Sequence, residues 1–134
     1  MTDEKTNLEK KILIVDDEEM FRTLYSIAIT PLGYAVETAK NGEEALEKIY
    51  SNKFVPDLII LDISMPKMDG LELATRIKKD EKYNNIKLII NSNTVDNEYI
   101  KAFGEIKISK ENIYDKLDFN LVRKVVKNAF SNSL

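Results

Sequence analysis

Short apolar runs alternate along this chain with longer stretches in which apolar residues recur every three or four positions. The runs at 11–15, 57–61 and 86–90 are continuous, as is typical of strands covered on both faces of a parallel sheet. The segment 34–39 alternates between apolar and polar residues, and 105–109 is a shorter apolar segment of the same kind. The pattern therefore predicts five strands.

The stretches between and after these predicted strands have the spacing of amphipathic helices. They cover residues 16–29, 41–50, 70–80, 94–103 and 119–130. Asn41 stands three residues before Glu44, which is the spacing of a capping box, and Asp17 is expected to cap the first helix. The last helix has the clearest apolar stripe, formed by Leu121, Val122, Val125, Val126 and Ala129.

Regular alternation of strand and helix predicts the α/β class. Right-handed crossovers would give a doubly wound (βα)5 sandwich, with a five-stranded parallel sheet in the common order 2-1-3-4-5. No internal repeat or linker divides the chain. We therefore expect one domain over residues 11–131, with a flexible tail at 1–10 and a short tail at 132–134.

The residue composition excludes several kinds of chemistry. The chain has no cysteine and no histidine, so Ser-His triads, thiolate catalysis and His/Cys zinc sites are excluded. A bound metal would have to be a hard ion that prefers oxygen, such as Mg²⁺ or Ca²⁺. The net charge of −3 argues against nucleic acid as the main partner. Apolar runs too short for a membrane span, and a charged start, predict a cytoplasmic protein without a membrane partner.

Acidic residues follow two of the predicted strands at the point where each strand ends. Asp16 and Asp17 come directly after 11–15, and Asp62 comes directly after 57–61. In the order 2-1-3-4-5 the first and third strands meet at the switch point, where ligands bind outside the carboxyl ends. Three carboxylates in one crevice repel each other unless a cation lies among them. The sequence therefore predicts a Mg²⁺ site there, completed by a backbone carbonyl and waters.

A hydroxyl and an ammonium are expected at the same edge of the sheet. Ser92 follows the predicted fourth strand, and Lys110 follows the predicted fifth strand. Both are donors that suit the oxygens of a phosphoryl group. Asp62 is then the candidate nucleophile, which would attack phosphorus to form an aspartyl phosphate.

Four motifs together resemble the response-regulator receiver domain of two-component signalling. They are ILIVDDEE, PDLIILDISMPKMDG, LIINS and KISK, and the resemblance extends over about 11–131. It implies a flavodoxin-like receiver fold. It also implies that Asp16 and Asp17 are the acidic pair, that Asp62 is the phosphoacceptor, and that the backbone carbonyl of Ser64 completes the Mg²⁺ shell.

The same resemblance implies that Ser92 is the switch hydroxyl and Lys110 the phosphate-binding lysine. Receivers take the phosphoryl group from a sensor histidine kinase or a phosphotransfer protein. They catalyse only their own phosphorylation and dephosphorylation, so the chain is expected to be a signalling domain and not an enzyme in the usual sense. Similarity to stand-alone, chemotaxis-type receivers implies signalling by contact with a downstream protein, without direct DNA binding.

Two alternatives and three departures accompany this interpretation. The chain could be a receiver-like interaction module that is never phosphorylated. A phosphatase of the haloacid dehalogenase type is disfavoured. Those enzymes have the motif D-x-D at this strand, whereas residues 62–64 are DIS and lack the second aspartate, the acid/base partner. With Lys110 as the lysine, the segment after Ser92 is short, Glu111 replaces the usual proline, and Lys107 replaces an aromatic residue of the family pattern.

Overall fold

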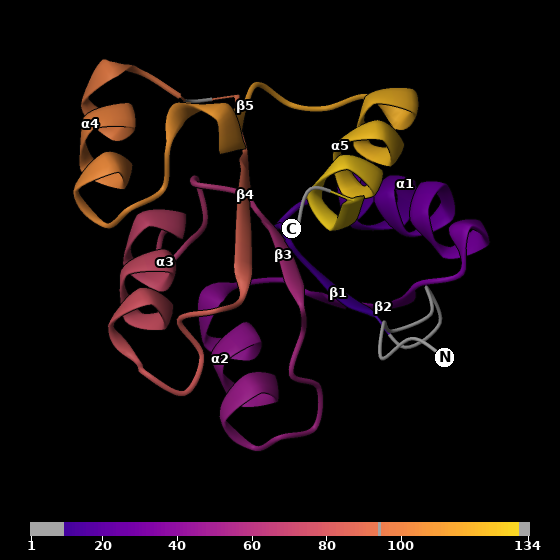
Figure 1. Cartoon of the computed structure of the whole chain (residues 1–134), viewed down its shortest axis with the longest axis horizontal. Helices are drawn as coiled ribbons and strands as arrows, with labels where there is room; N and C mark the ends of the chain where they lie inside the picture. The colour runs from indigo at the N-terminus through magenta and orange to yellow at the C-terminus, as the bar shows by residue number, and fades with distance from the viewer. Residues whose placement is uncertain (1–9, 94, 132–134) are drawn as a thin grey trace.

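The computed structural model describes residues 10–93 and 95–131 (Figure 1). In this part of the chain five parallel strands form one sheet in the order β2-β1-β3-β4-β5, as predicted. The strands are β1 (Lys11–Val15), β2 (Ala35–Ala39), β3 (Leu58–Leu61), β4 (Lys87–Asn91) and β5 (Ile113–Tyr114). The α-helices are α1 (Glu19–Ile29), α2 (Gly42–Tyr50), α3 (Gly70–Lys79), α4 (Asn97–Glu105) and α5 (Phe119–Ser131). Apart from Lys10, the predicted tails lie outside the described residues.

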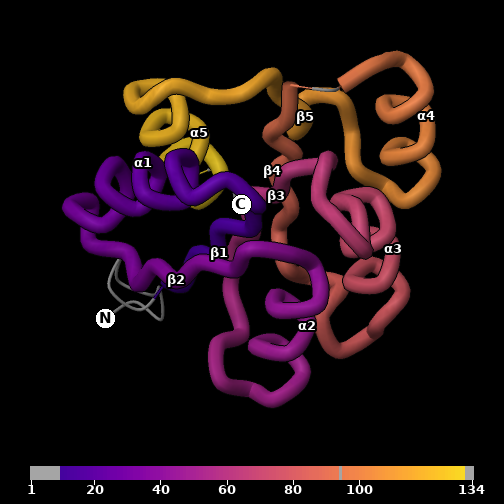
Figure 2. Tube along the Cα trace, turned by 180° about the vertical axis from the view of Figure 1, so that it is seen from behind, coloured from indigo at the N-terminus to yellow at the C-terminus, as the bar shows by residue number. Residues whose placement is uncertain are grey.

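The helices cover both faces of the sheet (Figures 1 and 2). Helices α1 and α5 lie together on one face, and α2, α3 and α4 lie on the other. Neighbouring residues of a strand point to opposite faces, so Ile12 and Ile14 join the cluster under α1 and α5. Leu13 and Val15 join the cluster under the other three helices. This double burial explains why β1 and β3 are continuous apolar runs. No helix of the described residues is long and apolar enough to cross a membrane.

The register of β1 and β3 sets the position of the acidic residues. Val15 lies opposite Leu61, so the residues that follow them, Asp16 and Asp62, leave the sheet at the same level. The backbone N–H of Asp62 donates to the carbonyl of Val15 at 3.0 Å. The strand order therefore brings together two carboxylates that are far apart in the sequence.

The expected fifth strand at 105–109 is wrong. Helix α4 continues to Glu105, and the chain then turns through Lys107, which has a φ of 71°. The N–H of Ile108 donates back to the carbonyl of Phe103 at 2.9 Å, and Ile108 packs against the apolar cluster. Apolar residues just after a helix often cover its last turn in this way, and their spacing imitates a short strand.

The true β5 is only two residues long and comes after a short 3-10 helix, η3 (Lys110–Asn112). It pairs with the last two residues of β4.

The expected cap of α1 is also wrong. Glu18, and not Asp17, is the N-cap, and its side chain makes no capping hydrogen bond. The backbone N–H of Glu18 instead donates to Oδ1 of Asp16 at 2.9 Å.

Candidate functional site at the carboxyl edge of the sheet

Three carboxylates meet where β1 and β3 end. One oxygen each of Asp16, Asp17 and Asp62 lies within 4.8 Å of the others. Asp16 is only 1% exposed and Asp62 5%, whereas Asp17 is exposed to solvent. The predicted convergence of these three residues is confirmed.

Burial makes the ionised form of two of these acids costly. It raises the pKa of Asp16 and of Asp62 above the ordinary value of 3.8. The ammonium of Lys116 lowers both pKa values, and the proximity of Asp16 raises the pKa of Asp62 further. The cluster is therefore a place where added positive charge is stabilising.

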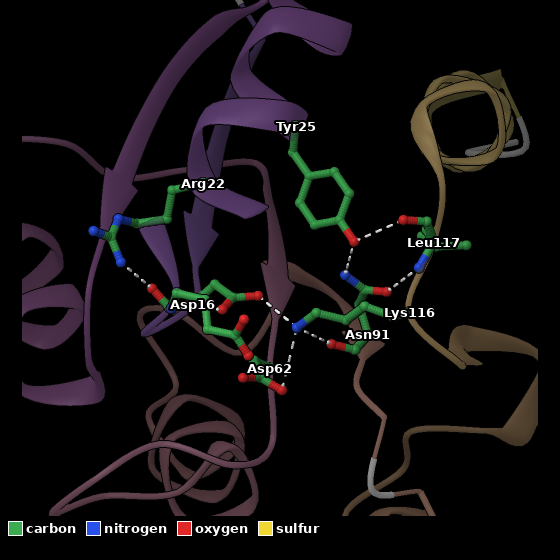
Figure 3. Close-up of polar contacts among 8 residues, drawn as sticks. Asp16, Arg22, Tyr25, Asp62, Asn91, Lys116 and Leu117 are labelled. Atoms are coloured by element: carbon green, nitrogen blue, oxygen red, sulfur yellow. Dashed lines mark hydrogen bonds and ion pairs between the residues drawn. The ribbon is translucent and has the colours of Figure 1, made fainter. Parts of the chain in front are cut away.

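Lys116 already supplies one positive charge to the cluster (Figure 3). Its Nζ lies 2.6 Å from Oδ2 of Asp16 and 3.5 Å from Oδ1 of Asp62. Only 8% of its side chain is exposed. The ammonium also lies 4.4 Å from the centre of the Phe21 ring on α1, a cation–π contact. Lys116 is thus held from three directions at the edge where the acids meet.

The prediction that Lys110 belongs to this site is wrong. Lys110 is exposed and lies in η3, before β5, which puts it at the amino end of that strand. The acids lie at the carboxyl ends of their strands, which in a parallel sheet is the opposite edge. Lys116, two residues after β5, occupies the position expected of Lys110. The error follows directly from the misplaced fifth strand.

The three departures noted from the family pattern change with this correction. Measured to Lys116, the segment after Ser92 is no longer short. Ile113, and not an aromatic residue, stands three residues before Lys116, although its neighbour in β5 is Tyr114. Leu117, and not Glu111, follows the lysine. The sequence signal for the true β5 was the apolar pair Ile113–Tyr114 shortly before Lys116, but two residues are too few to show a strand pattern.

Ser92 lies beside the phosphoacceptor candidate, as expected. It is 1% exposed, follows β4 directly, and its N–H donates to the carbonyl of Tyr114 at 3.1 Å. A hydrogen bond from its side chain lowers the pKa of Asp62. Ser64 is exposed in the loop after β3, and the role of its carbonyl stays a prediction.

The loop from β3 to α3 packs tightly against the end of its own strand. The N–H of Gly70 donates to the carbonyl of Ile63 at 2.8 Å. A Cβ on Gly70 would lie 2.2 Å from the backbone oxygen of Asp62, closer than any real contact. Glycine is therefore needed for helix α3 to begin so close to the acid.

The donor atoms fit a hard divalent cation. The cluster offers carboxylate oxygens from three residues, and the chain contains no histidine or cysteine that would favour a softer metal. Burial raises the pKa of Asp16 and of Asp62, so a bound cation would favour their ionised forms. The donor set suits a hard, oxygen-preferring cation such as Mg²⁺.

The doubly wound parallel sheet, with acids and a lysine at its switch point, has the architecture of α/β domains that bind ligands at that edge. The family model of the response regulator receiver domain matches residues 12–110, and the chain belongs to this family. Receiver domains are the phosphoacceptor modules of two-component signalling. The matched range ends before β5 and Lys116, the region in which the sequence was misread.

Relatives and solved structures agree with this assignment. The chain is 46% identical over 74 residues to the alkaline phosphatase synthesis transcriptional regulatory protein PhoP of Bacillus subtilis. The matched segment covers 55% of this chain and 30% of that protein. The phosphorylated cyanobacterial phytochrome response regulator RcpA is 26% identical, with a TM-score of 0.82 over 93% of this chain and 96% of that one. The chemotaxis response regulator CheY4 of Vibrio cholerae is 27% identical, with a TM-score of 0.77 over 89% and 97%.

Proposed function

We propose that this domain accepts a phosphoryl group on Asp62, in a Mg²⁺-dependent reaction, from a histidine kinase or a phosphotransfer protein of the cytoplasm. It then signals by contact with a downstream protein. The observation that carries this proposal is the meeting of three carboxylates, a buried lysine and a buried serine at the switch point of the sheet.

Asp62 is the best candidate for the nucleophile among the three acids. Asp16 is already engaged, with one oxygen on the Lys116 ammonium at 2.6 Å and the other on the N–H of Glu18 at 2.9 Å. Asp62 has a looser contact with Lys116, at 3.5 Å. In the proposed step a carboxylate oxygen of Asp62 bonds to phosphorus. The bond from phosphorus to the donor histidine breaks, and its electron pair returns to the ring nitrogen.

The remaining residues have supporting roles in this proposal. Asp16, Asp17 and Asp62, with the backbone carbonyl of Ser64, would hold the Mg²⁺, which when bound supplies positive charge beside the acids and the transferred group. The ammonium of Lys116 and the hydroxyl of Ser92 donate to phosphoryl oxygens as negative charge gathers on them. Lys116 thus takes the role first expected of Lys110.

Intact mass after incubation with acetyl phosphate and Mg²⁺ tests the proposal. We expect the wild type to gain one phosphoryl group and Asp62→Asn to gain none, because an amide is not a nucleophile at phosphorus. Asp80→Asn is the matched control, since Asp80 precedes β4 at the opposite edge of the sheet. A wild type that gains no mass with Mg²⁺ present, or an Asp62→Asn variant that gains as much, would refute the assignment.

A further inference from the structure

The residue after Lys116 is bound by side chains at both polar atoms of its backbone (Figure 3). The N–H of Leu117 donates to Oδ1 of Asn91 at 2.8 Å, and its carbonyl accepts from the hydroxyl of Tyr25 at 2.9 Å. Nδ2 of Asn91 in turn donates to the same tyrosine oxygen at 2.8 Å. These three hydrogen bonds form a closed ring, which joins α1, the end of β4 and the loop between β5 and α5.

The ring lies in the interior, where its polar groups need partners. Tyr25 is 0% exposed, Asn91 1% and Leu117 4%. A buried amide or hydroxyl without a hydrogen bond is destabilising, and here each of these groups has one. An amide at the last position of a buried strand is otherwise a poor choice, because an apolar residue would pack there without needing partners. The ring therefore calls for an explanation beyond core packing.

Helix α1 also contacts Lys116 directly. Phe21 and Tyr25 are one helical turn apart, and their ring centres are 5.8 Å from each other. The Phe21 ring faces the ammonium of Lys116, while the Tyr25 hydroxyl holds the backbone one residue further on. One face of α1 therefore restrains both the side chain and the loop of this lysine.

We propose that Tyr25 and Asn91 are positioning residues, which fix the backbone at Leu117 and so hold Lys116 across Asp16 and Asp62. Because the backbone beside Lys116 is already fixed, less backbone entropy is lost when the ammonium binds an anion. This inference rests on the proposed function. The competing explanation is that the ring only stabilises the fold.

A double-mutant cycle separates these explanations. The rate of phosphorylation from acetyl phosphate at saturating Mg²⁺ is measured for wild type, Tyr25→Phe, Lys116→Ala and the double variant. Tyr25→Phe removes both hydrogen bonds of the hydroxyl, and we expect it to slow the reaction by about three- to tenfold when Lys116 is present. In the Lys116→Ala background it should change the rate by less than about twofold, because no ammonium is left to position.

Stability and a second tyrosine provide the controls. Tyr25→Phe should lower the free energy of unfolding by the same amount in both backgrounds, because the fold loses the same hydrogen bonds. Tyr83→Phe is the matched control, since the buried Tyr83 hydroxyl also donates to a carbonyl, that of Ile49 at 3.4 Å, but in the cluster on the other face of the sheet. It should leave the rate unchanged. Asn91→Leu should repeat the result of Tyr25→Phe from the other side of the ring.

Two results would overturn the inference and leave the proposed function intact. One is a phosphorylated wild type with an unchanged rate in Tyr25→Phe. The other is an equal slowing in both backgrounds, which would mean that the ring acts through general stability. A wild type that takes up no phosphoryl group would overturn both proposals.

Discussion

At the scale of single residues, the site holds two carboxylates where water scarcely reaches. Asp16 and Asp62 are almost fully buried, and the Lys116 ammonium is their cationic partner among the described side chains. A buried charge that loses its partner is strongly destabilising, by about 3–5 kcal/mol in general. Lys116 therefore has two parts in this account: it balances the acids before phosphorylation and donates to the phosphoryl group afterwards.

Replacing each of two lysines tests which one belongs to the site. Lys116→Ala should slow phosphorylation by about 10²-fold, the usual effect of removing one donor to a developing anion. Lys110→Ala should leave the rate unchanged, because Lys110 is exposed in η3 before β5. Single-turnover rates with a small phosphodonor measure both effects. A larger effect from Lys110 than from Lys116 would contradict the placement of the site.

The raised pKa of Asp62 predicts how stability changes with pH. Because its pKa is higher in the folded than in the unfolded state, the folded state binds the proton more tightly. The resulting stabilisation is complete below the ordinary pKa of 3.8 and is lost as the pH rises through the raised value. At neutral pH without divalent ions, Asp62→Asn should therefore be more stable than wild type, and the difference should shrink as the pH approaches 4.

Chemical denaturation of both proteins at several pH values, in the presence of a chelator, measures this difference. The comparison cancels the contribution of acids far from the cluster, whereas Asp16 and Asp17 titrate together with Asp62. An advantage of Asp62→Asn that stays constant with pH, or grows as the pH falls, would show that burial does not raise the pKa of Asp62.

At the scale of elements, the site depends on how closely helices begin next to strand ends. Helix α3 begins at Gly70, with Asp69 as its N-cap accepting the N–H of Glu72 at 2.8 Å. The backbone of Asp62 lies directly against this first turn. The end of β3 and the start of α3 therefore form one packed unit, and this unit carries the nucleophile.

A comparison of two glycine substitutions, one at Gly70 and one at Gly104, tests this packing. Gly70→Ala should destabilise the domain by about 3 kcal/mol, because its Cβ would meet the backbone of Asp62 and Ile63. Gly104→Ala should stabilise it by about 0.5–1 kcal/mol, because Gly104 lies within α4 with no atom in the path of a Cβ. Free energies of unfolding from denaturant titrations decide the point. Equal effects from the two substitutions would contradict the role of Gly70 in this packing.

The same elements show how far a sequence can predict this fold. Strands β1, β3 and β4 were predicted closely, because burial on both faces leaves a continuous apolar run. The two-residue β5 leaves no such trace, and the apolar residues that follow α4 were mistaken for it. The acids at the strand ends were predictable from strand order alone. Lys116, and the hydrogen bonds that Asn91 and Tyr25 make with Leu117, were not predictable, since they depend on tertiary packing around a strand that the pattern does not reveal.

At the scale of the whole molecule, the site is assembled by topology. Placing β1 beside β3 brings the two acid-bearing loops together. The lysine arrives from the last loop of the domain, 100 residues beyond its partner Asp16. Helices α1 and α5 pack on one face (Figure 1), so the loop that carries Lys116 lies next to the helix that restrains it. The site thus draws its residues from the ends of β1, β3 and β4 and from the loop after β5.

The most direct test of the account is to locate the phosphoryl group in the chain. Borohydride reduces an acyl phosphate to an alcohol, so treatment of the protein after reaction with acetyl phosphate and Mg²⁺ marks the phosphorylated acid for peptide mass mapping. The account predicts that Asp62 alone is converted, and that a chelator prevents it. Conversion of Asp16 or Asp17 instead, or a phosphoryl group found on a hydroxyl residue, would contradict it.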